Sequence, residues 1–212
     1  MKYEWKKQEK EFYRATTTPA LVTMPMQSYI MINGKGNPND ADFSSRVAAL
    51  YSLAYAIKMG YKAAATAAGD SKEVSDFTVY PLEGVWTQQR DGDLVKEELE
   101  YTIMIRQPNF VTEGMVCKAM EAVKKKKPNP LYAEIRFATM EDGSCIEILH
   151  IGAFDDEPVS FLKMDQFAEK HHLERSKRFH REIYLNNPGR VEKSKLKTIL
   201  RYAVRKTRPA PL

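Results

Sequence analysis

The order of apolar segments repeats once along the chain, and this repetition constrains the fold more than any other feature. The stretches "MINGKG" and "LHIGAF" are apolar runs that end in Gly34 and Gly152, and each precedes a long helical pattern. Further on, "LEYTIMIR" resembles "LRYAVR", with Tyr101 and Tyr202 at matching places. Each half therefore reads strand, helix, strand, strand. Two such halves predict an α+β fold with pseudo-twofold symmetry and a central ligand groove at the seam.

Local patterns predict the helices within this framework. Residues 42–58 carry apolar side chains at helical spacing over four turns, directly behind N-cap candidates. A second periodic segment, residues 111–126, lies between two prolines, and a third helix is expected to start at Pro158. The Ala-rich segment 60–76 is expected to be a helix exit or turn followed by a polar loop.

Two Asp-Gly pairs predict β-hairpins. Asp91-Gly92 lies between expected strands 77–87 and 99–106. Asp142-Gly143 lies between expected strands 131–138 and 145–151. The remaining expected strands are 20–26, 29–32, 179–185 and 196–204.

Length and composition are those of a globular protein. The chain has 212 residues, of which 43% are hydrophobic, enough to bury a core in one domain. We therefore expect a single domain over residues 1–212. Its expected parts are repeat one at about 20–107, a connecting helix at about 111–126 and repeat two at about 131–205.

A mild positive charge does not identify a nucleic-acid binder. The 33 basic and 28 acidic residues give a net charge of +5 and are interspersed rather than segregated. The run Lys124 to Lys127 fits a helix C-terminus, where lysines complement the helix dipole. We expect no nucleic-acid partner, although binding through the basic tail, residues 207–212, stays a weak alternative.

The sequence shows no signal for export or membrane insertion. The start "MKYEWKKQEKEFYR" is a polar lead-in without a signal peptide's apolar run, and no stretch of 18 apolar residues occurs. Cys117 and Cys145 lack CxxC spacing and are expected to be reduced core thiols. We expect a cytoplasmic protein with no membrane partner, either a monomer or a homodimer.

No residue pattern predicts a metal site or a cofactor. The four histidines, which include the neighbours His171 and His172, lack ligand spacing and are expected in surface or core roles. The stretch "GKGNPN" lacks the order of a phosphate-binding loop, and no Ser or Cys nucleophile motif occurs.

The stretch "FHREIYL" places a glutamate in the middle of an expected strand. On a strand, Glu182 and Tyr184 point to one face, whereas Ile183 and Leu185 point to the other. Glu182 is then either an edge-strand charge that discourages aggregation or a carboxylate that meets a ligand. With its pKa raised by desolvation, such a carboxylate would act as a general base on water.

Aromatic residues are candidates for the walls of the same groove. A continuous strand through "FTVYPLEGVW" would place Tyr80, Gly84 and Trp86 on one face, with Gly84 leaving space beside two aromatic rings. Tyr51 and Tyr55 lie one residue off the core stripe of the first helix and could flank a cleft. The alternatives are boundary tyrosines and a core tryptophan, and a one-residue slip would turn Trp86 to the other face.

Three motifs in this duplicated order resemble the GyrI-like small-molecule-binding proteins, which are related to effector-binding domains of drug-responsive transcription regulators. The motifs are "LHIGAFDDEPVSFLKMDQF", "HREIYLNNP" and "GKGNPNDADF", and the resemblance covers about residues 3–204. Ala153 stands where the family usually has Pro, and Phe154 occupies the aromatic position. Asn187-Pro188-Gly189 replaces the usual Asp-Pro-Arg.

The resemblance implies a two-repeat fold with a central groove into which Glu182 projects. The chain is similar to stand-alone members, because fewer than 30 residues precede the first repeat strand and leave no room for a DNA-binding segment. One such subfamily hydrolyses the strained cyclopropane of DNA-alkylating natural products of the yatakemycin type, using an aromatic cage and a glutamate that orients or activates water. The catalytic residue expected here is Glu182, and the expected ligand-binding residues are Trp86, Tyr80, Tyr55, Phe154 and Tyr184.

A binding module without catalysis is the alternative of a different class. Such a protein would sequester a small molecule or inhibit a protein partner, as some members of the family are thought to inhibit DNA gyrase. It would bind its ligand saturably and release no product.

Overall fold

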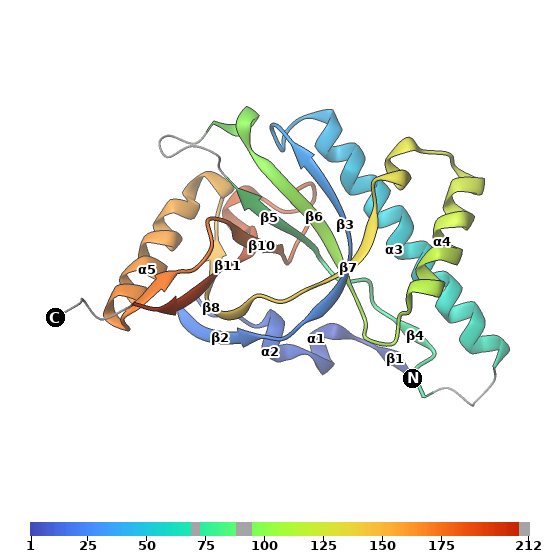
Figure 1. The fold of residues 1–212 in the computed structure, drawn as a ribbon, viewed down its shortest axis with the longest axis horizontal. Coiled ribbons are helices and arrows are strands. Elements are labelled where there is room, and N and C mark those ends of the chain that lie inside the picture. The colour runs from blue at the N-terminus through green and yellow to red at the C-terminus, as the bar shows by residue number, and fades with distance from the viewer. Residues whose placement is uncertain (69–72, 88–94, 208–212) are drawn as a thin grey trace.

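One large antiparallel sheet runs through the protein (Figure 1). A computed structural model describes residues 1–68, 73–87 and 95–207. In this part of the chain a nine-stranded sheet has the order β2-β8-β11-β10-β5-β6-β3-β7, and β9 pairs with β11. The strands are β2 (Ala20–Met24), β3 (Gln27–Lys35), β5 (Leu82–Thr87), β6 (Glu100–Gln107), β7 (Arg136–Met140), β8 (Gly143–Ile151), β9 (Leu173–Arg175), β10 (His180–Tyr184) and β11 (Lys197–Lys206).

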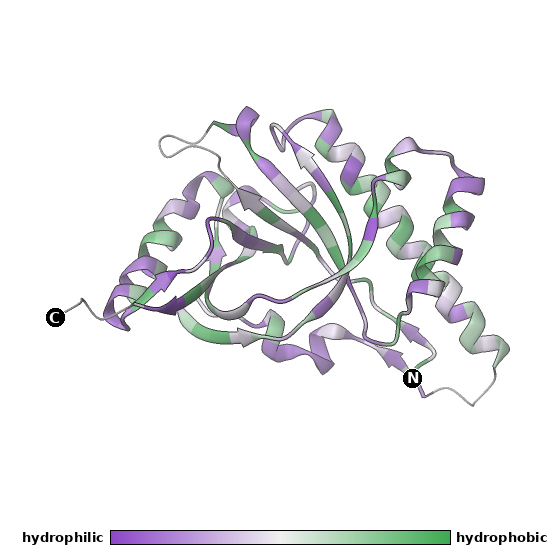
Figure 2. Cartoon of the chain, viewed as in Figure 1, coloured by the Kyte–Doolittle hydropathy of each residue, from purple (hydrophilic) through white to green (hydrophobic). Residues whose placement is uncertain are grey.

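Two helices cover one face of this sheet at its opposite ends. The helix α3 (Ala41–Ala67) packs residues such as Leu50 into a core with β3 and β6, and α5 (Glu157–Lys170) packs Met164 against β8 and β11. A third helix, α4 (Glu113–Lys126), packs on α3. All three alternate hydrophobic and hydrophilic stretches (Figure 2). The central strands β5 and β10 therefore lie between the ends covered by α3 and α5.

The strand order is symmetric about the β10–β5 pair. The first half contributes β5, β6 and β3 in that order, and the second contributes β10, β11 and β8. The outer strands are exchanged, because β2 pairs with β8 of the second half and β7 pairs with β3 of the first. The expected α+β fold with two related halves is confirmed.

Several local expectations are wrong. The expected strand 131–138 begins as a short 3-10 helix, and Cys117, expected to be a core thiol, is exposed. Strands β7 and β8 form no hairpin across Asp142-Gly143, because β7 pairs with β3 while β8 pairs with β2 and β11. The first long helix does not end near Lys58 but continues to Ala67, because alanines are strong helix formers and Tyr61 and Ala65 are buried. The Asp91-Gly92 turn lies outside the described residues, although its flanking strands β5 and β6 pair antiparallel.

The N-terminal segment belongs to the core and is not only a polar lead-in. The strand β1 (Lys2–Tyr3) pairs in parallel with β4 (Asp76–Phe77), and Trp5 and Tyr13 are buried. Glu9, which follows the first short helix, forms an ion pair with the buried Arg106. The short helices of the described chain are α1 (Trp5–Gln8), α2 (Lys10–Tyr13), η2 (Lys96–Glu98), η3 (Pro130–Ala133), η4 (Phe154–Asp156) and η5 (Lys193–Lys195). None of the described helices is long and apolar enough to cross a membrane.

A buried ion pair joins the two halves on the sheet face opposite the helices α3 and α5. Arg181 of β10 is 3% exposed, and its Nη1 lies 2.8 Å from Oε2 of Glu83 on β5. Its Nη2 donates to Oδ1 of Asp142 at 2.9 Å. Because a buried charge is costly without partners, this arrangement ties β10 to β5 and to the loop between β7 and β8.

We expect Arg181→Ala to destabilise the protein by roughly 3–5 kcal/mol, because it leaves Glu83 buried without a counter-charge. The matched control is Arg205→Ala, which breaks an exposed pair with Glu174 and should cost about 1 kcal/mol or less. Urea unfolding of both variants measures the difference. Equal midpoints for the two variants would contradict the prediction.

Candidate functional site

Glu182 lies in the middle of β10 on the sheet face that carries α3 and α5. It pairs with Gly84 on β5 and with Leu200 on β11. Its neighbours Arg181 and Ile183 point to the opposite face, where Arg181 meets Glu83. The alternation expected along "FHREIYL" is thus present in the strand, and the glutamate stands on a central strand rather than an edge strand.

The carboxylate of Glu182 is enclosed and bonded at both oxygens. The Tyr184 hydroxyl donates to Oε2 at 2.7 Å, and Nε2 of His180 lies 2.9 Å from Oε1. The Trp86 indole N–H in turn donates to the Tyr184 oxygen at 2.9 Å. Glu182 is 8% exposed, so these bonds replace the water that its charge would otherwise need.

Burial and the neighbouring carboxylate of Glu182 hold the pKa of Tyr184 well above its ordinary value. The phenol therefore stays protonated and remains a donor. Because it accepts from Trp86 while it donates to Glu182, the chain of hydrogen bonds polarises in one direction, toward the carboxylate. The result is a localised negative charge held by fixed donors.

Aromatic rings surround this chain of hydrogen bonds. Phe43 of α3 stacks on Trp86 at a centroid distance of 5.8 Å, and Phe154 of η4 meets Tyr184 edge to face at 5.8 Å. Phe161 of α5 meets the His180 ring at 4.8 Å. We call Trp86, Phe154, His180, Glu182 and Tyr184 the Glu182 cluster. Side chains from both α3 and α5 therefore contact the cluster, which lies where the two halves of the sheet meet.

The turn after β8 places Phe154 and the start of α5. Gly152 has a φ of 145°, a conformation that side-chain-bearing residues rarely adopt. His150 binds the next turn through Nε2, 2.9 Å from the Ala153 carbonyl oxygen, and through Nδ1, 2.9 Å from Ser160 Oγ. Since a carbonyl only accepts, the proton is on Nε2 and Ser160 donates to Nδ1. This imidazole links β8, η4 and α5.

Gly84 provides the space that the Trp86–Tyr184 contact needs. A Cβ at this position would lie 2.5 Å from Trp86 Nε1 and 3.1 Å from the Tyr184 hydroxyl oxygen. Both distances are shorter than ordinary contacts between non-bonded carbon and polar atoms. The absent side chain at Gly84 therefore lets the indole and the phenol meet beside Glu182.

A second carboxyl group faces the cluster from the first turn of α5. Glu157 is 7% exposed, and its buried Oε1 has no hydrogen-bond partner among the described residues. Burial, and then the charges of Glu182 and Asp155, raise the pKa of Glu157 to about 9. At neutral pH, Glu157 is therefore a carboxylic acid next to a carboxylate.

The structure does not bring Tyr80 to the Glu182 cluster. The strand β5 begins only at Leu82. Tyr80 lies with the N-terminal segment, where its hydroxyl donates to Glu9 Oε1 at 2.7 Å and its ring stacks on Trp5. The expectation that Tyr80 shares a face with Trp86 is wrong, because residues 78–81 are not part of β5.

Tyr55 lies on α3 away from the centre of the cluster. Its side chain is 55% exposed, and its ring is 6.4 Å from that of Tyr51 one turn earlier. Phe43, which contacts Trp86, stands three turns before Tyr55 on the same helix. Of the five expected ligand-binding residues, the structure groups Trp86, Phe154 and Tyr184 with Glu182.

Several residues of the site escaped the sequence analysis. His180 and Glu182 are two apart on one strand, so alternation alone would have placed them on one face. Glu157 and Phe161 lie where the sequence predicts only the start of a helix at Pro158. Their contacts with β10 depend on how α5 docks, which no local pattern encodes.

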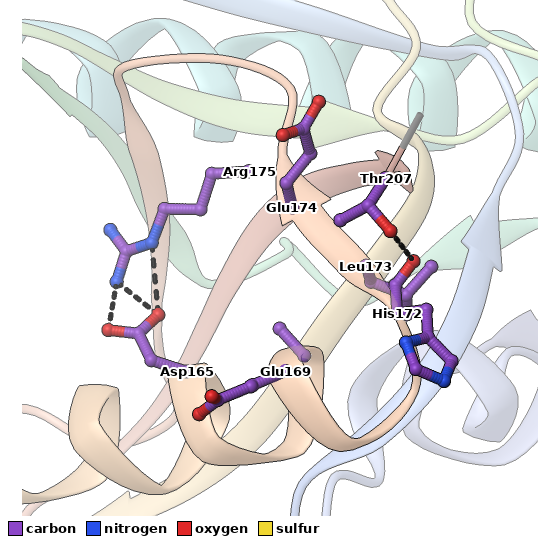
Figure 3. A pocket seen from close by; sticks show the side chains of 8 residues that line it. Asp165, Glu169, His172, Leu173, Glu174, Arg175 and Thr207 are labelled. Atoms are coloured by element: carbon purple, nitrogen blue, oxygen red, sulfur yellow. Dashed lines mark hydrogen bonds and ion pairs between the residues drawn. The ribbon is translucent and has the colours of Figure 1, made fainter. Parts of the chain in front are cut away.

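Two surface hollows lie away from the cluster. One of about 400 Å³ is formed by α5, β9 and the end of β11, where Arg175 is paired with Asp165 (Figure 3). Another of about 510 Å³ lies at the β3–β6 end near Arg46. Neither is lined by Glu182 or Trp86. Among the described residues, no group of three or more His, Cys, Asp or Glu is arranged to hold a metal ion.

Comparison with known families decides what kind of protein carries this geometry. The model of the GyrI-like small molecule binding domain matches residues 17–204. The chain belongs to the GyrI-like family. The match includes both halves of the sheet and every residue of the Glu182 cluster, so the cluster lies within the GyrI-like domain.

Solved structures from Listeria innocua are similar to this GyrI-like protein over nearly its whole length. An uncharacterized conserved protein is 35% identical, with 96% of this chain and 100% of that chain covered and a TM-score of 0.86. A hydrolase is 34% identical, with 97% and 100% covered and a TM-score of 0.85. A second hydrolase structure is 33% identical, with 96% and 100% covered and a TM-score of 0.82.

A more distant structure shares the GyrI-like fold alone. The C-terminal domain of EcmrR is 12% identical, with 90% of this chain and 98% of that domain covered and a TM-score of 0.53. None of the curated proteins compared with the chain matches it.

We expect Gly84→Ala to destabilise the GyrI-like protein by about 1–3 kcal/mol, because the new methyl group forces the Trp86 indole away from Tyr184. The matched control is Gly60→Ala inside α3, where a Cβ meets nothing within 4 Å. That change should stabilise the protein by about 0.5–1 kcal/mol. Urea unfolding with the two variants side by side tests the opposite signs, and a shift of the same sign in both would refute the explanation.

Proposed function

We propose that this GyrI-like protein binds planar, apolar small molecules against the Glu182 cluster and hydrolyses cyclopropanoid DNA-alkylating compounds. The observation that carries the proposal is the buried carboxylate of Glu182, bonded to Tyr184 and His180 and bordered by aromatic rings. The similarity to Listeria innocua hydrolases at 33–34% identity supports a catalytic role for the same fold.

The proposed reaction requires the protein to position the substrate and a water molecule and to supply a general base. Strain already weakens the carbon–carbon bonds of a cyclopropane, so the reaction needs an oriented water molecule and a group that removes its proton. Glu182 is the base, and Tyr184 and His180 hold its carboxylate in place. General-base assistance of this kind contributes roughly 10²-fold to 10⁴-fold to a rate.

The aromatic residues select the ligand. A flat conjugated ligand would stack against Trp86 and Phe154, whose rings come from opposite sides of the cluster. Glu182 lies on β10, directly beside the strand β5 that carries Trp86. Tyr55 and Tyr80 have no part in the proposed arrangement.

We expect Glu182→Gln to lower the rate of ring opening by about 10²-fold to 10⁴-fold, because an amide cannot take the proton of water. The assay incubates purified protein with a cyclopropanoid alkylator and follows the hydrated product by mass spectrometry. The control is Glu174→Gln, which changes an exposed glutamate paired with Arg205 and should leave the rate unchanged. Full turnover by Glu182→Gln would refute the mechanism.

A second candidate function is binding without catalysis, and the bonding of Glu182 favours it. Both oxygens of the carboxylate already have partners, as expected of a group that recognises a ligand and takes no proton. In that case the same assay shows no product, and Glu182→Gln changes only the affinity for the compound, as measured by equilibrium binding.

A further inference from the structure

Glu157 faces Glu182 across the cluster. It lies three residues after Phe154 and four residues before Phe161, so these side chains share one side of the η4–α5 segment. The rings of Phe154 and Phe161 contact Tyr184 and His180, and both of those residues bind Glu182. Glu157 therefore stands between two contacts that converge on the same carboxylate.

The surroundings of Glu157 favour its neutral form. Glu182 on β10 and Asp155 on η4 act on its charge, and Glu157 in turn acts on Tyr184 of β10. The other groups on these elements are His180 on β10, which contacts Phe161, and His150 on β8, which is bonded to Ser160 of α5. His180 is bonded to Glu182, and the hydrogen bonds of His150 go to Ala153 and Ser160. Lys96 is paired with Asp155. The N-terminal end of α5 favours a negative charge, but this effect is weaker than full desolvation.

The two carboxyl groups differ in their hydrogen bonds. Tyr184 and His180 are bonded to the oxygens of Glu182, whereas Oε1 of Glu157 is buried and unpartnered among the described residues. An unpartnered buried oxygen is costly unless a ligand satisfies it. The oxygen is thus available to a polar group of a ligand.

We propose that Glu157 is the proton donor of the site, a neutral carboxylic acid that protonates the ligand oxygen on which negative charge develops when the ring opens. This inference rests on the proposed function and adds a second catalytic residue to it. The substrate class is narrowed accordingly to cyclopropanes conjugated with a carbonyl group.

The reaction balances with these two residues and one water molecule. The water oxygen forms a bond to a cyclopropane carbon, the carbon–carbon bond breaks, and its electron pair moves through the conjugated system to the carbonyl oxygen. Glu182 takes a proton from the water, and Glu157 gives its own proton to the carbonyl oxygen, which leaves a hydroxyl group. Transfer of the proton from Glu182 to Glu157 then restores the starting pair.

The pKa of Glu157 is about 9, against 4.5 for an ordinary glutamate. The proton on Glu157 can therefore be detected without substrate, through the pH dependence of the protein's stability. A folded-state pKa raised above the unfolded value means that the native state holds a proton which the unfolded chain releases. The corresponding stability is fully present below pH 4.5 and is lost as the pH rises toward 9. Glu157→Gln removes this dependence while keeping the shape of the side chain.

The test compares wild type, Glu157→Gln and the control Glu169→Gln, an exposed glutamate on the same helix. We expect the melting temperature of Glu157→Gln to equal that of wild type at pH 5. At pH 9 it should be higher than that of wild type by about 4 °C or more. We expect its rate of opening of a carbonyl-conjugated cyclopropane to fall about 10²-fold at pH 7. The alkaline decline of the wild-type rate near pH 9 should be absent in Glu157→Gln. Glu169→Gln should match wild type in both measurements.

The outcomes separate this inference from the proposed function. A wild-type protein that opens the ring, together with a Glu157→Gln variant of equal rate and equal alkaline decline, overturns the donor role and leaves the proposed function standing. A wild-type protein that opens no ring overturns both. Identical melting temperatures of wild type and Glu157→Gln at pH 9 would refute the claim that Glu157 is protonated in the folded protein, whatever the rates are.

Discussion

The pairing of β5 with β10 is the constraint on which the rest of the structure depends. This pairing joins the two halves of the sheet, and its register sets Glu182 opposite Gly84. On the reverse face the same two strands carry the buried pair of Arg181 and Glu83. A slip of one residue would exchange the two faces, placing a guanidinium among the aromatic rings and leaving Glu83 without its partner. The ion pair on one face thus holds the carboxylate in position on the other.

The exchange of outer strands makes the two halves interdependent. Strand β2 completes the sheet of the second half and β7 completes that of the first. Neither half therefore has all its strand pairings without the other, and the interface between them includes much more than the central strands. A site at the seam is rigid for this reason, since the elements beside it cannot separate without breaking pairings at both ends of the sheet.

The sequence predicted features that repeat locally, and it missed those that depend on docking. The duplicated order, the helix ending at Lys126 and the alternation along "FHREIYL" follow from periodicity, and the structure contains each of them. The Asp142-Gly143 hairpin failed because strand exchange gives β7 a distant partner. Tyr80 was misplaced because the strand breaks at residues 78–81, and Glu157 went unnoticed because its meaning depends on Glu182, which lies on another element.

The location of the two tryptophans gives the protein two natural optical reporters. The chain has only Trp5 and Trp86, and their indole N–H groups have different partners, the Val79 carbonyl oxygen and the Tyr184 hydroxyl. Trp5 stacks on Tyr80 in the N-terminal segment. The Trp86 indole is instead bonded to Tyr184, beside the carboxylate of Glu182. Replacing Trp5 by Phe would leave Trp86, beside Glu182, as the single tryptophan of the chain. Its emission would then report ligand entry and changes of ionisation there, without a dye and without chemical labelling.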